Sequence, residues 1–368
     1  MNRSNWRYFD FWLLGAVALL TIFGIMMIRS SVAGNIELST DTNLVNRQIL
    51  FAVVGFVVVF IIASMDYRFF SGVSQPLYWV TAVFMAVLTI AGQAFFGSAR
   101  WFDTGVILIQ PSELAKIVVI ITLAEFFSRN KHRLDNLIWV GVSLLYTIGI
   151  VVWILLQPNL STSLVILVIW FAMLWASGLR MKHLALFIAT GIALPFVAFP
   201  FLQEYQRLRI LNFLFPDPQQ SYGETYNLLQ ALIAIGSGGL LGQGYGQGTQ
   251  VQLRFLKVRW SDFIFSVIAQ ELGFVGVVFM MAVILFVIIR ILSAARKARD
   301  TFGALICYGV ATLIAFQAFV NMGVNLRLIP ATGLTLPFVS YGGSSLLSLL
   351  IGVGLVQSVL LRQKNIEF

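Results

Sequence analysis

The dominant pattern along the chain is a series of long apolar runs separated by short polar connectors. About 20 consecutive apolar residues suffice for a helix to cross the hydrocarbon core of a bilayer. A window of that length predicts about ten transmembrane helices. They are expected at residues 8–29, 46–64, 74–95, 110–127, 137–156, 161–177, 183–203, 263–293, 303–327 and 342–362.

Composition supports this fold class. The 368 residues are 59% hydrophobic and 11% charged, with a mean hydropathy of +0.90, whereas soluble domains have roughly 25% charged residues. The apolar runs are too long for the alternating strands of a membrane β-barrel. We therefore predict an all-α integral membrane protein that forms a single polytopic membrane domain over residues 1–368 and contains no separate soluble domain.

One long segment departs from the apolar pattern. Residues 204–262, between the seventh and eighth predicted spans, contain a glycine-rich run and several basic residues. We predict a long extracytoplasmic loop there. The glycine run lacks the Gly-Lys-Ser/Thr ending of a nucleotide-binding loop. Close backbone packing and anion binding by backbone N–H groups both stay open for it.

The distribution of Lys and Arg predicts the orientation of the chain. With a cytoplasmic N-terminus, most basic residues fall in inner connectors, and an even number of spans places both termini in the cytoplasm. The other basic residues lie on or near the outer face, which favours an anionic ligand there. They are Arg29, Arg47, Arg100, Lys116, Arg207, Arg209, Arg254, Lys257, Arg259 and Arg327.

Glu113 and Lys116 are the clearest charged residues within an apolar span. Pro111 suits the first turn of their helix, and a spacing of three residues places both side chains on one helix face. Charged residues at membrane depth are costly and usually serve function. We expect the pair to act in or support a site, the alternative being a structural ion pair that fixes helix packing.

Two further polar features lie on the predicted outer side. Asn159 lies in a polar break between the fifth and sixth spans. Such a break is tolerated only against protein or a water-filled cavity, so Asn159 is expected to face the same cavity as Glu113, or else to cap a helix in an ordinary turn. Arg100 beside Trp101 is equally consistent with anion binding and with interfacial snorkelling.

Asp262 directly precedes the long eighth span. On a continuous helix, Asp262, Ser266, Ala269, Gly273 and Gly276 would fall within about 40° of one line, leaving room for a groove or a close helix contact. An acid at such a position, with Arg207, Arg209 and Lys257 in the same loop, can act as a general base while the cations hold a polyanion. The alternative is a helix N-cap.

The segment from Pro330 to Ser345 is punctuated by Pro and Gly and leads into the last span. Ser340 and Ser344 are expected either to donate hydrogen bonds to a ligand or to cap that helix. Metal and disulfide chemistry is not indicated elsewhere, because Cys307 is the single cysteine and neither His132 nor His183 has ligands at the usual zinc spacing.

Together these motifs resemble the SEDS family (shape, elongation, division and sporulation) of RodA- and FtsW-type peptidoglycan glycosyltransferases. The resemblance covers nearly the whole chain. It is carried by Gln110–Lys116, Ala234–Gly239, Gly248–Gln250, Asp262–Phe265 and Leu336–Ser345.

The resemblance implies polymerisation of lipid II into glycan strands at the outer face of a bacterial cytoplasmic membrane, and a class B penicillin-binding protein as partner. It also implies that Asp262 is the catalytic aspartate and that Glu113 and Lys116 are the intramembrane pair. A divalent cation, Mg²⁺ or Mn²⁺, is a candidate cofactor, and no organic cofactor is expected. Among the possible roles, cell elongation is favoured over division and sporulation.

The chain departs from the family pattern at three places. Asn159 stands where the family usually has Asp, Trp260 and Ser261 stand where it usually has His-Thr, and Arg327 replaces a small residue. Two other classes of function stay open. They are a transporter of lipid-linked oligosaccharide, with polar residues along the whole membrane depth, and a non-catalytic scaffold of a cell-wall synthesis complex.

Overall fold

The structure, a computed structural model, describes residues 5–33, 42–96, 102–103, 108–134, 136–179, 204–215 and 224–363, with positions 183, 185, 187, 189–191, 193, 197 and 199–202. The α-helices are α1 (Phe11–Val32), α2 (Thr42–Ser64), α3 (Tyr67–Phe96), α4 (Pro111–Arg129), α5 (Leu137–Leu156), α6 (Leu160–Ala176), α8 (Glu204–Leu214), α9 (Glu224–Gly238), α10 (Thr249–Gln252), α11 (Ile264–Lys297), α12 (Thr301–Asn325) and α13 (Gly343–Leu361). Short 3-10 helices are η1 (Asn5–Tyr8), η2 (Lys131–Arg133) and η3 (Phe199–Phe201), and two-residue strands β1 (Phe102–Asp103) and β2 (Leu108–Ile109) pair antiparallel.

The predicted all-α membrane fold is confirmed. In the described part of the chain, seven helices are long and apolar enough to cross a membrane. They are α1, α2, α3, α5, α11, α12 and α13, and α6 is a shorter apolar helix. The predicted span at 110–127 is the helix α4, whose charged residues set it apart from the others. The predicted span at 183–203 lies largely outside the described residues, although the described positions between His183 and Val197 are helical.

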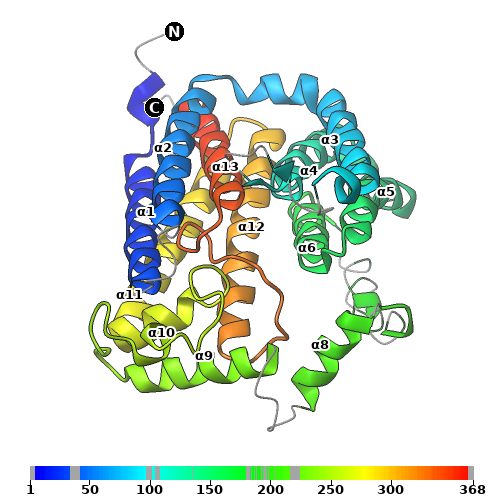
Figure 1. Ribbon diagram of the computed structural model, residues 1–368. Helices are drawn as coiled ribbons and strands as arrows, with labels where there is room; N and C mark the ends of the chain where they lie inside the picture. The colour runs from blue at the N-terminus through cyan, green and yellow to red at the C-terminus, as the bar shows by residue number, and fades with distance from the viewer. Residues whose placement is uncertain are drawn as a thin grey trace.

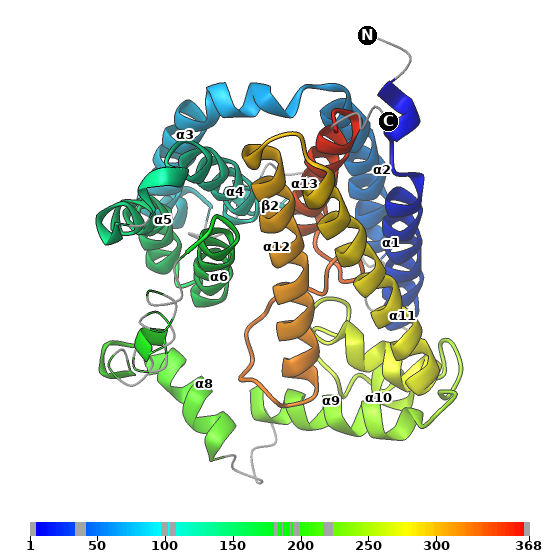
Figure 2. The same cartoon turned by 180° about the vertical axis from the view of Figure 1, so that it is seen from behind.

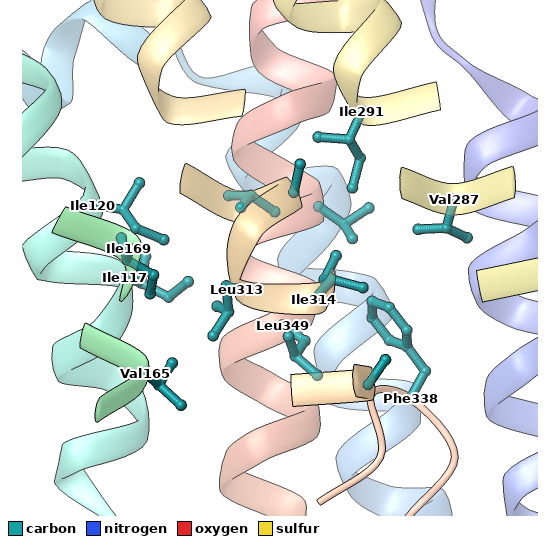
Figure 3. Close-up of a cluster of buried hydrophobic side chains, with 14 of the residues drawn as sticks. Ile117, Ile120, Val165, Ile169, Val287, Ile291, Leu313, Ile314, Phe338 and Leu349 are labelled. Atoms are coloured by element: carbon teal, nitrogen blue, oxygen red, sulfur yellow. The ribbon is translucent and has the colours of Figure 1, made fainter. Parts of the chain in front are cut away.

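Helix α12 lies between two groups of helices (Figures 1 and 2). It packs against α11 and α13 on one side and against α4 and α6 on the other. Figure 3 shows buried apolar side chains from both sides meeting around it. Those labelled are Ile117, Ile120, Val165, Ile169, Val287, Ile291, Leu313, Ile314, Phe338 and Leu349. Burial of such side chains in one continuous core fixes the positions of the segments that carry the polar residues.

Helix α3 begins earlier than the sequence predicts, at Tyr67 rather than at residue 74. Its first part runs across one end of the bundle before the helix turns down beside α4 and α5 (Figure 1). Pro76 lies inside the helix, and an interior proline removes a backbone hydrogen bond and bends a helix. The hydropathy window predicted the later part of this helix and missed its first turns.

The long segment 204–262 is not an unstructured loop, because α8, α9 and α10 lie within it. Helix α9 lies across the end of the bundle that is opposite the two chain termini (Figure 1).

The prediction of one continuous helix from 263 to 293 is wrong. Helix α11 is interrupted at Gly273, which has a φ of 67° and a ψ of −166°. In a continuous helix, the N–H groups of Phe274 and Val275 would donate to the carbonyls of Gln270 and Glu271, four residues earlier. The interruption breaks both hydrogen bonds. The glycine-rich run after α9 provides new partners for these two N–H groups and two carbonyls.

The backbone bonds pair these groups closely. Phe274 and Val275 donate to the carbonyls of Gly239 (2.9 Å) and Leu240 (3.1 Å). The N–H groups of Gln243 and Gly244 donate to the carbonyls of Gln270 (2.9 Å) and Glu271 (3.0 Å). Backbone groups that lose their helical partners at membrane depth must find others. The glycine-rich run supplies these partners and thereby completes the backbone hydrogen bonding of α11 at the break.

The backbone of the glycine-rich run lies so close to the backbone of α11 that two of its glycines have no room for a side chain. A Cβ at Gly238 would lie 1.9 Å from the carbonyl oxygen of Ala269, and one at Gly242 would lie 2.2 Å from that of Glu271. Of the two interpretations left open by the sequence, close backbone packing is the one observed. The continuous line through Ser266, Ala269 and Gly276 is wrong, since the break at Gly273 interrupts it. The close helix contact, the alternative to a groove, is observed where α9 approaches Ala269.

Candidate active site

Three consecutive carbonyl groups hold the segment Trp260–Asp262 in place. The carbonyl of Trp260 accepts from the N–H of Tyr341 (2.9 Å), and that of Ser261 accepts from the hydroxyl of Ser340 (2.6 Å). The carbonyl of Asp262 accepts from two buried amides of α12, which are described next. Because every carbonyl of this segment accepts a hydrogen bond, the backbone holds the Asp262 side chain in position and leaves its carboxylate out of these bonds.

Asn321 and Asn325 of α12 both donate to the carbonyl of Asp262, at 3.0 and 2.9 Å. Asn321 also donates to the carbonyl of Leu334 (2.7 Å), and Asn325 accepts from the hydroxyl of Ser266 (2.6 Å). The two amides thereby join the loop that carries Asp262, the segment before α13 and the first turn of α11. Both side chains are buried.

The carboxylate of Asp262 faces a cavity of about 340 Å³. Among the described residues, Ser261 is the one side chain that donates to it, with 2.9 Å between Ser261 Oγ and Asp262 Oδ1. Burial raises the pKa of the Asp262 carboxyl, while the hydrogen bond from Ser261 and the charge of Arg209 act in the opposite direction. Phe263, rather than Asp262, is the N-cap of α11, so the capping alternative is wrong.

The cavity collects side chains from distant parts of the sequence. Arg47 and Phe51 come from α2, Glu113 from α4, and Thr162 from α6. The remaining lining residues are Gln110, Asn159, Trp260, Ser261, Asp262, Gly333, Leu334, Thr335, Tyr341, Gly342, Gly343, Ser344 and Ser345. A largely apolar cavity with a few convergent polar and charged groups is typical of a small-molecule site.

Arg47 provides a positive charge on the lining of the cavity that holds Asp262. Burial raises the pKa of the Tyr341 hydroxyl, and the neighbouring Arg47 partly lowers it. A second cavity of about 430 Å³ adjoins the first and shares Asn159 with it. Arg209 of α8 lines the second cavity, so each cavity has its own cation.

Glu113 and Lys116 form the ion pair that their spacing predicts. The distance between Lys116 Nζ and Glu113 Oε2 is 2.7 Å, and the side chains are 0% and 8% exposed. Glu113 lines the cavity, but its charge is neutralised by Lys116. The pair therefore suits a supporting role better than proton transfer.

The chain is similar to known proteins along nearly its whole length. The model of a family described as cell cycle proteins, which covers FtsW, RodA and SpoVE, matches residues 11–365. The peptidoglycan glycosyltransferase MrdB of Escherichia coli (strain K12) is 32% identical, over 100% of this chain and 98% of MrdB. The probable peptidoglycan glycosyltransferase FtsW of Geobacter metallireducens is 33% identical, over 99% and 98%. The chain belongs to the SEDS family.

Comparison with solved structures also identifies relatives of the SEDS family. One, described as "Structural coordination of polymerization and crosslinking by a peptidoglycan synthase complex", is 30% identical with a TM-score of 0.78, and the match covers 96% of this chain and 97% of that chain. The rod shape determining protein RodA of Thermus thermophilus is 29% identical with a TM-score of 0.68, over 97% and 98%. This SEDS chain is thus a helical membrane protein of the glycosyltransferase class to which its relatives are assigned.

The structure brings four of the ten site residues that the sequence predicts for this SEDS chain to the lining of one cavity. Asp262, Glu113, Asn159 and Ser344 line the cavity. Asn159 both faces it and caps α6, accepting from the N–H of Thr162 (3.3 Å), so its two expected roles coexist.

Ser340 and Ser344 do not cap the last span. The N-cap of α13 is Gly342, without a side-chain cap bond. Ser344 accepts from the N–H of Gln110 (2.9 Å), and Ser340 supports Ser261 as described above. Both serines thus connect segments around the cavity.

The loop cations are distributed differently from the prediction. Arg209 lines the second cavity, whereas the guanidinium of Arg207 donates to the carbonyl of Pro200. Lys257 is exposed and lines neither of the two cavities. Arg100 lies outside the described residues.

From the sequence, Arg47 was placed among the basic residues that break the positive-inside pattern, but it was not assigned to the site. Asn321 and Asn325 were missed. The two asparagines had a signal, because a pair of amides four residues apart inside an apolar span is costly unless bonded.

The donor set of the cavity does not fit a resident divalent cation. Within the described residues, no group of three or more His, Cys, Asp or Glu side chains could hold a metal ion. Asp262 and Glu113 are the carboxylates that line the cavity, and Lys116 neutralises Glu113, whereas hard cations prefer several oxygen ligands. Dependence on Mg²⁺ or Mn²⁺ stays a prediction, which chelation of the purified enzyme would test.

Proposed function

We propose that this SEDS glycosyltransferase polymerises lipid II into β-1,4 glycan strands at the outer face of a bacterial cytoplasmic membrane, with Asp262 as the general base. Its membership of the family carries the reaction class. The observation that supports the site is the half-buried carboxylate of Asp262, which is held through its own backbone carbonyl and lines a cavity with a cation on its lining.

In the proposed reaction, Asp262 takes the proton from the 4-hydroxyl of the acceptor sugar while that oxygen attacks the anomeric carbon of the donor. The bond between that carbon and the pyrophosphate oxygen breaks, and polyprenyl pyrophosphate leaves. Displacement of an α-linked pyrophosphate to give a β link is an inversion, so one base suffices without a covalent enzyme intermediate. The raised pKa of Asp262 makes it a stronger base.

Arg47 and Arg209 are the cations that best suit the leaving group. Each lines one of the two adjoining cavities, and fixed positive charge near a leaving pyrophosphate stabilises the transition state. Arg207 and Lys257 are less suited because of their placement. Two cavities that meet at Asn159 also suit a reaction between two lipid-linked substrates.

A class B penicillin-binding protein is the proposed partner, and cell elongation the proposed role. Support comes from the similarity to a synthase complex described as coordinating polymerization and crosslinking, and to MrdB and RodA. Both described ends of the chain lie at the same end of the bundle (Figure 1), in agreement with two cytoplasmic termini.

The test uses purified protein, with and without a cognate penicillin-binding protein, supplied with lipid II and a divalent cation. Wild type is expected to give glycan ladders on a gel, and Asp262→Ala none. The matched control is Asp66→Ala, which removes an exposed carboxylate elsewhere in the chain and should polymerise like wild type. Full polymer from Asp262→Ala would refute the role of Asp262.

A transporter is the second candidate, and the buried pair of Glu113 and Lys116 is the observation that favours it. Absence of ladders under every condition, with lipid II binding intact and lipid II crossing proteoliposomes, would select transport. Absence of both activities would select the non-catalytic scaffold.

A further inference from the structure

A separate cavity of about 350 Å³ lies at the end of the bundle near the chain termini. Its lining comes from η1, the start of α1 and the C-terminal ends of α11 and α13. This is the end away from α9 and the glycine-rich run (Figure 1). None of its lining residues belongs to the site around Asp262.

The charges that line this cavity are unbalanced. Arg7, Arg290 and Lys297 provide three positive charges, and Asp10 provides the one negative charge. Asp10 is paired with Arg290, with 2.7 Å between Arg290 Nη2 and Asp10 Oδ2. Arg7 and Lys297 are exposed, and neither forms an ion pair within the described part of the chain. The cavity therefore attracts an anion.

Several hydrogen bonds hold Asp10 in place. The carboxylate of Asp10 accepts from the N–H of Leu13 (3.0 Å) and so caps α1. Its backbone N–H and carbonyl are both bonded to the side-chain amide of Gln357 (3.0 and 2.8 Å), which is fully buried in α13. The negative charge of Asp10 is balanced by Arg290. Asp10 therefore does not oppose an anion next to Arg7 and Lys297.

Apolar side chains extend the cavity outward. Phe11 and Trp12, at the first turn of the membrane-spanning helix α1, are 65% and 75% exposed. Aromatic side chains at the end of a span lie at the level of the lipid headgroups. A ligand with a charged head in the cavity and an apolar tail along α1 would satisfy both surfaces.

From this arrangement we propose that the cavity binds an acidic phospholipid of the leaflet at the terminal end of the bundle, with the lipid phosphate between Arg7 and Lys297. The excess of two positive charges favours a lipid with net negative charge over a zwitterionic one. The exposed Phe11 and Trp12 favour a lipid over a soluble phosphate. This site is independent of the reaction at Asp262.

The experiment measures lipid binding by native mass spectrometry of the delipidated full chain. Phosphatidylglycerol is titrated against phosphatidylcholine, and inorganic phosphate is added as a competitor. A basic residue near an acidic lipid contributes roughly fivefold in affinity, so the double variant Arg7→Gln/Lys297→Gln should bind phosphatidylglycerol about 25-fold more weakly. Binding of phosphatidylcholine should not change.

The matched control is Arg296→Gln/Arg299→Gln, which removes two exposed charges from the same end of the bundle but outside the cavity. It should retain phosphatidylglycerol binding within about twofold. All variants change exposed residues, and unchanged thermal unfolding would confirm that they fold. Equal loss in both pairs would overturn the proposal in favour of a diffuse surface charge, and displacement by millimolar phosphate would overturn it in favour of a soluble anion.

Discussion

The carboxylates of Glu113 and Asp262 line the same cavity, but they differ in the groups that hold them. Glu113 is held by a buried lysine at 2.7 Å. Asp262 has a hydroxyl donor, Ser261, and is positioned through its backbone carbonyl instead. The comparison separates a carboxylate that is paired within its own helix from one that is held through its backbone and lines the cavity.

The difference follows from where each residue is anchored. The side chain of Glu113 is engaged by its own helix, whereas Asn321 and Asn325 bind the main chain of Asp262 and leave its carboxylate directed to the cavity. A general base needs both a fixed position and an unpaired charge. Asp262 meets both conditions, and Glu113 meets the first.

The largest expected effect is that of Asp262→Asn on polymerisation. The amide keeps the shape of the side chain but cannot take a proton, so the rate should fall about 10³-fold, within the usual range for a general base. The measurement is the initial rate of glycan formation at saturating lipid II. A loss below tenfold would assign the proton transfer elsewhere.

The same substitution should stabilise the fold at neutral pH. Burial raises the pKa of the folded Asp262 carboxyl above its unfolded value. The folded state then binds the proton more tightly, so the free energy of unfolding decreases as pH rises from the unfolded to the folded pKa and stays lower above it. Asp262→Asn should therefore raise Tm at neutral pH, whereas a lower Tm would contradict the burial argument.

Lys116→Met should damage stability rather than chemistry. It leaves Glu113 as a buried charge without its lysine, and breaking a buried pair costs about 3–5 kcal/mol of unfolding free energy. The double variant Glu113→Gln/Lys116→Met removes both charges and should recover much of that loss and most of the polymerase rate. An inactive but fully stable double variant would show that Glu113 takes part in the reaction.

Asn325→Ala should have a smaller effect, confined to turnover. It removes one of two amide donors to the carbonyl of Asp262 and the acceptor of the Ser266 hydroxyl. Small displacements of a catalytic group can cost up to about 100-fold, so we expect kcat to fall roughly tenfold with KM unchanged. Asn325→Asp, which keeps the acceptor and loses the donor, should show a similar loss. A change in KM alone would contradict a positioning role.

The smallest effect is that of Ser261→Ala on the pH profile. The Ser261 hydrogen bond lowers the pKa of Asp262, so its removal should raise that pKa. The base form would then be lost at higher pH as the solution is acidified, and the acid limb of the rate profile should shift upward. The plateau rate should stay within about twofold. Ser261→Thr keeps the hydroxyl and should retain the wild-type profile, and a shift to lower pH would refute the contact.

The features predictable from the sequence were those with a local signal. Apolar runs gave the spans, and a three-residue spacing gave the ion pair of Glu113 and Lys116. The polar break at Asn159 correctly pointed to a cavity shared with Glu113. The positive-inside rule singled out the basic residues of the outer side as exceptions. Two of these, Arg47 and Arg209, line the two cavities.

The features not predictable depend on contacts between distant segments. The bonds from Asn321 and Asn325 to Asp262 join positions about 60 residues apart, and no periodic pattern encodes them. The interruption at Gly273 is invisible to hydropathy, because a break in the backbone leaves the apolar content of the span unchanged.

The interruption at Gly273 also divides α11 into two parts. Both sides of the break are bonded to the glycine-rich run, through the carbonyls of Gln270 and Glu271 before Gly273 and through the N–H groups of Phe274 and Val275 after it. A span adapts to a thinner or thicker bilayer by tilting. Because the run is bonded on both sides of the break, a change in the tilt of this span would have to be transmitted to the glycine-rich run.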